Sequence, residues 1–365
     1  MLKMSSYFDE FRKAIEPDSK RKKEAMKADD PVREHLAAHE SFADRHVDTF
    51  LYGSYRRNTA VGDIKDVDIV VVTNYTTDDD PVDVLEELKD SLAELYNEPD
   101  LADQRRSIRI DRPLPTVPDS KLTLDVIPAI YQKEDNPDGP LWVPDRDKKR
   151  WIPSHPKGHI AYSNNLSERS KLENGFVRLA KMMKWWWKYQ FEQRKSGVPS
   201  HERKPKGFWV EVMTGEYADL SQESYPELIL TLLENTFREF KSFRTTGQIP
   251  TLPDPGLRDY RDPNYRLIKT SMATAELAFF LDTLEESLGW ARQAGAATSE
   301  RTASEFWRLF FGDKFPLAPD DRITSSLLSS AVAPSGLSFP NKPVEPRKPG
   351  GFACCISGSL RTKRD

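Results

Sequence analysis

A run of β-branched residues at positions 67–72, VDIVVV, constrains the fold of this chain more than any other short segment. Valine and isoleucine pack well on a pleated surface, so the run predicts a buried strand. A shorter apolar run precedes it at 47–52, and the segments 107–112 and 121–130 alternate apolar and polar residues as half-buried strands do. Residues 76–98 contain an Asp-Pro pair that would cap a helix. Strand, strand, helix, strand, strand is an α+β pattern and predicts a mixed sheet with antiparallel neighbours.

The second half of the chain has the periodicity of amphipathic helices. Residues 224–243 and 270–293 predict two helices, and Asn165 with Glu168 stands at capping-box spacing ahead of a third at 170–193. The expected architecture therefore has three parts: an α+β domain with N-terminal helices at 1–160, an all-helical domain at 161–330, and a C-terminal tail at 331–365.

The tail carries five prolines among small and basic residues between Ala333 and Phe352. Such a stretch cannot bury enough apolar surface to fold, so we predict a disordered, extended segment. The two cysteines, Cys354 and Cys355, lie beyond these prolines. This placement excludes disulfides and cysteine-based zinc sites from the body of the chain.

The overall charge is close to balanced, with 54 basic and 58 acidic side chains among 365 residues. This balance argues against a protein that coats a long duplex by neutralising its phosphates, so DNA binding is not expected. No segment approaches the roughly 18 uninterrupted apolar residues of a membrane span. The N-terminus lacks the layout of a signal peptide. We therefore expect a cytoplasmic protein without membrane contact.

Three aspartates have the arrangement expected of a divalent-cation site. Asp66 and Asp68 stand at i and i+2 where the 67–72 strand begins, so their side chains share one face. Asp125, between apolar residues of another predicted strand, would complete the set. Mg²⁺ prefers such oxygen ligands, and two ions about 4 Å apart can activate a hydroxyl and neutralise a phosphate leaving group. Two alternatives to a metal site are open. Asp66 and Asp68 could be solvated carboxylates in a loop, and Asp125 could pair with an arginine at the edge of a strand.

Gly53 and Ser54 follow the first predicted strand. Glycine lets the backbone approach a ligand closely, and serine offers a hydroxyl and an N–H to phosphate oxygens. Arg56 and Arg57 add positive charge next to them. A Gly-Ser pair alone is weak, but its order before the Asp-x-Asp pair and the later strand aspartate is specific.

The helix at 170–193 has a core face and a lysine stripe. At 100° per residue, Lys181, Lys184 and Lys188 fall beside the face that we predict to be buried. This stripe is either solvated or directed into a binding site. The three consecutive tryptophans at 185–187 span too much of the circumference to share one role, and we predict that Trp185 and Trp186 pack at a domain interface rather than stack on a base. The predicted core face consists of Phe176, Ala180, Met183 and Trp187.

The ordered set Gly53-Ser54, Asp66-x-Asp68 and Asp125 resembles the signature of the polymerase β-like nucleotidyltransferases. The segments GSYRRNTAV, DVDIVVV, WIPSHPKGHI and FVRLAKMMKWWW resemble, in particular, the cGAS/DncV-like branch, the CD-NTases of the bacterial anti-phage signalling systems called CBASS. The similarity covers residues 1–353, and the tail and helical domain resemble clade D most.

This resemblance implies a role for each core residue. Asp66 and Asp68 would bind both metal ions. Asp125 would ligate the catalytic ion and help to activate the ribose hydroxyl. Gly53 and Ser54 would hold the phosphates.

The resemblance extends to residues outside the predicted sheet. In the family a lysine of the 170–193 helix reaches the triphosphate; Lys184 is the predicted residue and Lys181 the alternative. Phe208, in KGFWVEVM, would lie against a nucleobase unless it is buried in the core. Relatives often have serine at Gly207, so one phosphate contact is in doubt. The loop 253–267 resembles a segment near the acceptor nucleotide, without roles for its residues.

The implied activity is the condensation of ATP, with or without GTP, into an adenine-rich cyclic di- or trinucleotide. Mg²⁺, with Mn²⁺ as the alternative, would be the cofactor, and the product would activate a cell-killing effector. The tail, up to Ala353, resembles the C-terminal tails of relatives that are conjugated. In these relatives an E1/E2-like accessory protein joins the terminal carboxyl group of the tail to an amine. Here 12 further residues, CCISGSLRTKRD, would block that reaction unless they are removed.

Two other functions stay open at this point. A nucleotidyltransferase that makes linear oligonucleotides or modifies small molecules would share the three aspartates. An inactive binding module with this fold would usually have lost an acidic ligand, whereas all three are present. His155, His159 and His201 lack cysteine partners and ligand spacing, so we predict surface or capping roles for them rather than a zinc site.

Overall fold

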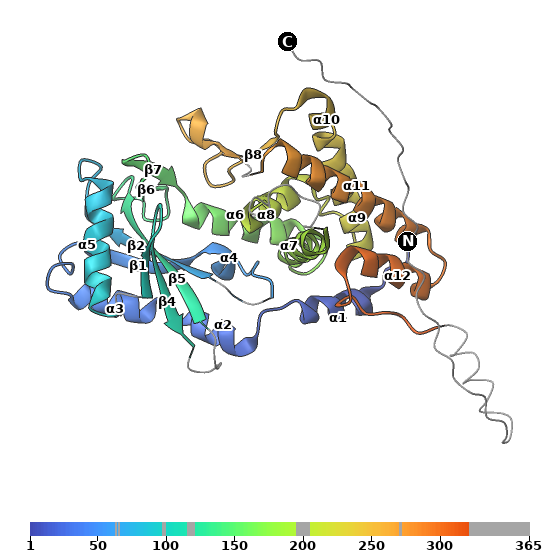
Figure 1. Ribbon diagram of the computed structural model, residues 1–365, viewed down its shortest axis with the longest axis horizontal. Helices are drawn as coiled ribbons and strands as arrows, with labels where there is room; N and C mark the ends of the chain where they lie inside the picture. The colour runs from blue at the N-terminus through green and yellow to red at the C-terminus, as the bar shows by residue number, and fades with distance from the viewer. Residues whose placement is uncertain are drawn as a thin grey trace, which may run out of the picture. The chain divides into compact units, whose positions relative to one another are not determined.

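The strands predicted from the sequence lie in one mixed sheet, which has seven strands within the described residues (Figure 1). Five follow the order β1-β2-β5-β4-β3, and β6 and β7 extend the sheet from the end of β5. Four of the seven confirm the predicted segments, whereas β3, β6 and β7 were not predicted. Their bounds are β1 (His46–Tyr52), β2 (Asp66–Thr73), β3 (Leu101–Asp103), β4 (Ile108–Pro113), β5 (Lys121–Tyr131), β6 (Leu141–Asp145) and β7 (Arg150–Ser154).

The computed structural model describes residues 1–62, 64, 66–96, 100–114, 121–194, 205–269 and 272–320. Residues Met1–Pro319 form one compact unit. The predicted tail at 331–365 and His201 lie outside the described residues. The division predicted near residue 160 stays a prediction.

The β2–β5 pair is parallel, and the other strand pairs in the described part of the chain are antiparallel. A parallel neighbour requires a crossover, and the chain makes it through α5 (Pro81–Ala93). As predicted, Asp80 caps this helix, because its carboxylate accepts a hydrogen bond from the Val82 N–H at 2.7 Å. The crossover brings β2 and β5 side by side with Asp68 opposite Asp125.

The two faces of the sheet have different chemistry. Val67 and Ile69 of β2 and Leu124 of β5 are buried in the core that α5 and α3 (Asp30–Ala38) cover. Because side chains alternate along a strand, Asp66, Asp68 and Asp125 lie on the opposite face. The apolar alternation therefore decides which way the carboxylates point.

The remaining described helices and a small hairpin build the helical part and the sheet's flank. They are α1 (Ser5–Ala14), α2 (Ser19–Met26), α4 (Gly53–Arg56), α6 (Pro156–Arg169), α7 (Gly175–Arg194), α8 (Gly207–Tyr217), α9 (Tyr225–Phe240), α10 (Phe243–Thr246), the 3₁₀ turn η3 (Pro263–Tyr265), α11 (Thr274–Ala296) and α12 (Glu300–Phe311), with strands β8 (Thr251–Pro253) and β9 (Leu267–Lys269). The α+β prediction with helices in the second half is confirmed.

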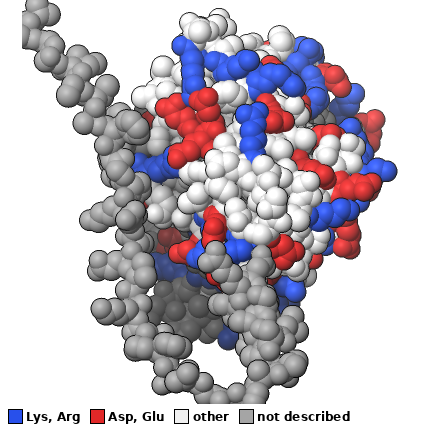
Figure 2. All heavy atoms as spheres, turned by 90° about the vertical axis from the view of Figure 1, so that its right-hand side faces the viewer, with Lys and Arg blue, Asp and Glu red and all other residues white. Residues whose placement is uncertain are grey.

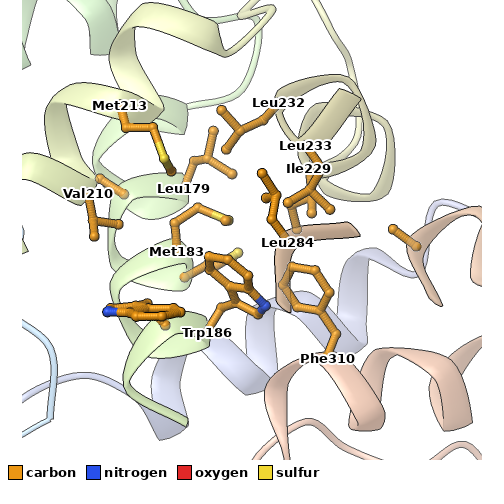
Figure 3. Packing of buried hydrophobic residues seen from close by; sticks show 14 of the residues in the cluster. Leu179, Met183, Trp186, Val210, Met213, Ile229, Leu232, Leu233, Leu284 and Phe310 are labelled. Atoms are coloured by element: carbon orange, nitrogen blue, oxygen red, sulfur yellow. The ribbon is translucent and has the colours of Figure 1, made fainter. Parts of the chain in front are cut away.

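The core of the helical part surrounds α7, and the predicted core face of that helix is confirmed as buried. Trp186 lies beside Phe310 of α12 (Figure 3), with ring centroids 5.6 Å apart. Its indole N–H donates a hydrogen bond to the Ser287 hydroxyl at 3.0 Å. The interface role predicted for Trp186 is therefore wrong, because α11 and α12 enclose it. Trp185 lies at the edge of this core and donates to the Phe311 carbonyl at 2.9 Å.

Two local predictions need correction. Asn165 and Glu168 do not start a helix, because α6 already begins at Pro156, whose fixed φ suits a first helical turn, and runs through both residues. The α+β domain predicted at 1–160 includes the first helix, α1, but α1 packs into the helical part. The ring centroids of Phe11 in α1 and Phe311 in α12 are 4.3 Å apart. The sequence pattern shows that α1 has a hydrophobic face, but it does not show which distant helix that face packs against.

The outer face of the helical part carries basic and acidic side chains next to each other (Figure 2). Arg244 pairs with Asp282 and Glu285 of α11, and Arg292 of α11 pairs with Glu234 of α9. Exposed pairs of this kind contribute at most about 1 kcal/mol each. No helix in the described part of the chain is both long enough and apolar enough to cross a membrane.

Candidate active site

Gly53 sits where β1 ends, directly after Tyr52, whose Cα pairs with that of Asp68. Its φ of +74° is a left-handed conformation that side chains with a Cβ rarely adopt. A Cβ at this position would lie 1.8 Å from Oδ2 of Asp68. Glycine is therefore required both by the turn into α4 and by the carboxylate beside it.

The three predicted carboxylates lie together on one face of the sheet. Asp68 is in register with Asp125, and Asp66 is in register with Thr123. Burial, and after it the negative charges of Asp66 and Asp125, raise the pKa of Asp68 to about 6. Burial also raises the pKa of Asp125, although Arg109 opposes this change. The carboxylates thus accumulate negative charge that Arg57 and Arg109 neutralise only in part.

Asp125 also has the arginine partner that was the alternative interpretation. Nε of Arg109 on β4 lies 3.4 Å from Oδ1 of Asp125. No three His, Cys, Asp or Glu side chains in the described residues enclose a metal site in this conformation. The oxygen donors and their uncompensated charge nevertheless fit a hard cation such as Mg²⁺. Asp125 would have to share its carboxylate between Arg109 and that ion.

A pocket of about 620 Å³ brings most of the predicted residues together. Asp125 is not part of its wall but adjoins Asp68 across the β2–β5 pair. Lys181 is outside it and lines a separate cavity of about 370 Å³. The predicted residues in its wall are Gly53, Ser54, Asp66, Asp68, Lys184 and Phe208.

Lys184, the predicted residue, and Lys181, its alternative, have different partners in the structure. Nζ of Lys184 donates to Oε2 of Glu211 at 2.6 Å and to the Thr59 hydroxyl at 2.9 Å. Nζ of Lys181 instead donates to Glu16 at 2.7 Å, away from the pocket. Both side chains are largely buried, at 10% and 4% exposure, so a solvated stripe is the wrong description for these two.

Arg57 and Glu211 form a buried ion pair that sequence reasoning missed. Nε of Arg57 donates to Oε1 of Glu211 at 2.8 Å. Burial alone would raise the pKa of Glu211, but the charges of Lys184 and Arg57 outweigh it and hold the pKa far below its usual range. The available signal was a glutamate inside the apolar helix GFWVEVM, because such a residue needs a partner.

Phe208 lies in the first turn of α8, half-buried in the pocket wall. The Arg57 guanidinium lies 4.9 Å from the centre of its ring, so the ring is held from one side by a cation. A Cβ on the neighbouring Gly207 would meet only the Lys184 side chain, with Cε at 3.7 Å and Cδ at 3.9 Å. The backbone there has room for a serine side chain.

The comparisons with known proteins show the family of the chain. Residues 2–166 match the Second Messenger Oligonucleotide or Dinucleotide Synthetase domain. A curated cyclic AMP-AMP-AMP synthase from Acinetobacter sp. (strain ATCC 27244 / 9458) is 32% identical over 355 residues, covering 93% of this chain and 94% of the relative. The structure of the CD-NTase CdnG from Bradyrhizobium diazoefficiens, in complex with GTP, aligns with a TM-score of 0.63. The chain belongs to the CD-NTase family.

The fold of this CD-NTase is shared at low sequence identity. The CdnG alignment has 14% identity and covers 84% of this chain and 95% of that one. A cyclic AMP-AMP-GMP synthase from Enterobacter hormaechei subsp. hoffmannii (strain UCI 50) is 25% identical and covers 96% of this chain and 100% of the relative. The chain is thus a nucleotidyltransferase of the cyclic-oligonucleotide synthase type, and the polymerase β-like fold prediction is confirmed.

Two histidines of this CD-NTase attach the 253–267 loop to α6. His159 is buried, with Nδ1 2.7 Å from the Tyr52 hydroxyl and Nε2 2.7 Å from Oδ1 of Asp254. His155 contacts the Gly256 carbonyl at 2.7 Å. The surface or capping role predicted for His159 is therefore wrong, because its ring bridges the end of β1 to the loop.

Replacing His159 by leucine should release this loop. Tyr52 and Asp254 would each lose a partner, which costs about 1–3 kcal/mol per buried polar group. We expect limited trypsin digestion at Arg258, Arg261 or Arg266 to become roughly tenfold faster, because cleavage follows the population of the open loop. The control is His35→Leu, which removes a remote ring contact to the Ser91 carbonyl. Equal acceleration by both changes would contradict the bridging role.

Proposed function

We propose that this CD-NTase condenses ATP, with or without GTP, into an adenine-rich cyclic di- or trinucleotide in a Mg²⁺-dependent reaction. The observation that carries the proposal is one pocket whose wall contains Gly53, Ser54, Asp66, Asp68 and Lys184. A turn for phosphates, clustered carboxylates and a lysine are the parts that nucleotidyl transfer needs.

The side chains divide the work by chemistry. Asp66, Asp68 and Asp125 would hold Mg²⁺, or Mn²⁺ in its place. When bound, the metal lowers the pKa of the attacking ribose hydroxyl and neutralises charge on the leaving pyrophosphate. Ser54 would donate to phosphate oxygens from the turn after β1. Lys184 would supply a fixed positive charge for the triphosphate.

Other residues would contact the nucleobase and the acceptor nucleotide. Phe208 would stack on a nucleobase, since its ring lies in the pocket wall and Arg57 holds it in place. The Asp254–Gly256 segment, which His155 and His159 hold, would border the acceptor nucleotide. His159 lies beside both, with its ring centroid 4.9 Å from that of Phe208 and its Nε2 2.7 Å from Oδ1 of Asp254.

The names of the relatives support the choice of nucleotides. The 32% identical relative is a cyclic AMP-AMP-AMP synthase, and the Enterobacter relative is a cyclic AMP-AMP-GMP synthase. Both names contain at least two adenylates, so ATP is the expected main substrate and GTP an additional one. A trinucleotide product is favoured for the same reason.

The biological setting follows from the family. We propose that the cyclic product acts in anti-phage defence by activating an effector, so the chain meets that effector only through its product. An E1/E2-like accessory protein would conjugate the tail, whose residues lie outside those described. The 12 residues after Ala353 would have to be removed first.

Mass spectrometry of the reaction products tests the proposal. The full chain is incubated with Mg²⁺ and all four NTPs, treated with phosphatase, and the linkages are then mapped with nucleases. We expect a phosphatase-resistant product rich in adenylate, formed also from ATP alone. Linear, phosphatase-sensitive products would instead support the alternative of a linear oligonucleotide synthase. Absence of any product would support an inactive binding module.

A further inference from the structure

Glu211 of α8 makes more contacts than a simple ion pair requires. It is buried, with a side-chain exposure of 1%. Its Oε1 accepts from Arg57 Nε at 2.8 Å and from the Ser163 hydroxyl at 3.2 Å. Its Oε2 accepts from the Thr59 hydroxyl at 2.7 Å and from Lys184 Nζ at 2.6 Å. One carboxylate thus joins the segment after α4 to α6, α7 and α8.

Two of these partners lead directly to the nucleotide pocket. Thr59 lines the pocket, and its N–H donates to the Ser54 carbonyl at 2.8 Å. Lys184 also lines the pocket, and its three ammonium protons are directed to Glu211, the Thr59 hydroxyl and the Thr59 carbonyl. The carboxylate therefore sets the position of both a serine and a lysine in the wall.

We propose that Glu211 is a positioning residue for nucleotide binding, which fixes Lys184 and, through Thr59, Ser54 at the wall where the triphosphate binds. This inference rests on the proposed function. Glu211 does not touch the nucleotide in this assignment, and it acts through the two residues that do.

The charge of Glu211 matters as much as its shape. Burial lowers the pKa of Lys184, and Glu211 is the neighbour that opposes this most. Arg57 and Lys181 are both positive and lower it further. The other charged groups of the pocket wall are Asp66 and Asp68 of β2, Lys188 and Glu192 of α7, and Lys206 before α8.

The sign of the pH effect follows from these neighbours. With Glu211 neutralised, the pKa of Lys184 falls, so the ammonium is present at low pH and is lost as the pH rises through the lowered pKa. A charge that attracts the triphosphate is then lost over the same range. In the wild type, Glu211 opposes that fall in pKa, so the ammonium is retained to a higher pH than in the variant and the affinity for ATP changes less.

A matched control is the ion pair of Lys181, which lies one turn before Lys184 on α7. Lys181 pairs with Glu16 at 2.7 Å, is similarly buried, and lies outside the nucleotide pocket. Glu211→Gln and Glu16→Gln each remove one carboxylate charge from a lysine of α7. Both changes should lower the melting temperature, but only the first should change nucleotide binding.

The experiment measures kcat and KM for ATP at about pH 7 and about pH 9, because a lowered lysine pKa brings the loss of its charge toward this range. We expect Glu211→Gln to raise KM by roughly tenfold to a hundredfold, the factor that matches the loss of a charge-assisted hydrogen bond. The increase should be larger at the higher pH, with kcat changing much less. Glu16→Gln should leave KM close to the wild-type value at both.

Glu211→Asp separates charge from geometry. It keeps a carboxylate but withdraws it by one methylene, so KM should rise without a new pH dependence. If Glu211→Gln does not fold, an unchanged KM in Glu211→Asp overturns the inference. Equal KM values for Glu211→Gln and Glu16→Gln also overturn it. A wild type that makes no product contradicts the proposed function instead.

Discussion

Replacing Asp66 and Asp68 together by asparagine is expected to reduce pyrophosphate release from ATP by about a thousandfold or more. The metal that these carboxylates are proposed to hold would supply several kcal/mol of transition-state stabilisation, and each 1.36 kcal/mol is a factor of ten in rate. Asparagine preserves the shape of each side chain and removes only its charge. Release of pyrophosphate with saturating Mg²⁺ and ATP measures the effect.

The same double variant should fold at least as well as the wild type. The pKa of Asp68 is raised to about 6, so its charged form opposes folding above its ordinary pKa, near 4. Asparagine removes that penalty, and the melting temperature without divalent ions should stay equal or rise. Asp111→Asn is the control, because Asp111 accepts from the Thr123 hydroxyl at 2.7 Å and is outside the pocket wall. Equal pyrophosphate release by wild type and the double variant would remove the enzymatic assignment.

Gly53→Ala is expected to lower activity by about a hundredfold, the cost of misplacing a catalytic group by roughly 1 Å. The new Cβ would lie 1.8 Å from Oδ2 of Asp68, so either the turn or the carboxylate must move. The left-handed φ adds about 1–2 kcal/mol of backbone strain. Initial rates and urea unfolding of the same preparation separate the two effects.

Gly247→Ala is the matched control for strain. Gly247 has a φ of +65°, and a Cβ there would meet no heavy atom within 4 Å. This variant should lose stability by the strain alone and keep its activity. If Gly53→Ala and Gly247→Ala lost stability equally and both kept full activity, the close approach of Gly53 to Asp68 would have no catalytic importance.

The sheet and its carboxylates could be predicted because their signals are local. Alternation in 121–130 directs Asp125 away from the core, and alternation at the start of the 66–73 strand does the same for Asp66 and Asp68. Gly53 could be placed because a glycine that directly follows a strand marks a tight turn or a close approach of the backbone. Each of these inferences needs only a few neighbouring residues.

The polar partners could not be predicted because they join distant segments. Glu211 meets Arg57 from more than a hundred positions away, and His159 reaches Asp254 from another part of the chain. Helix geometry placed Lys181 and Lys184 on one stripe, but only packing shows that one faces Glu16 and the other the pocket. Pairing of charges is decided by the tertiary fold.

The packing of α1 has a consequence for truncation of the chain. The helical core is built from α1 together with α7 to α12, whereas the strands and the helices that cover them come from the chain between. The sheet is thus an insertion into the helical part, tethered at both ends by the segments before α2 and along α6. Because α1 supplies Phe8 and Phe11 to the helical core, a chain that began after α1 would retain β1 to β7 but lose part of the core that surrounds α7.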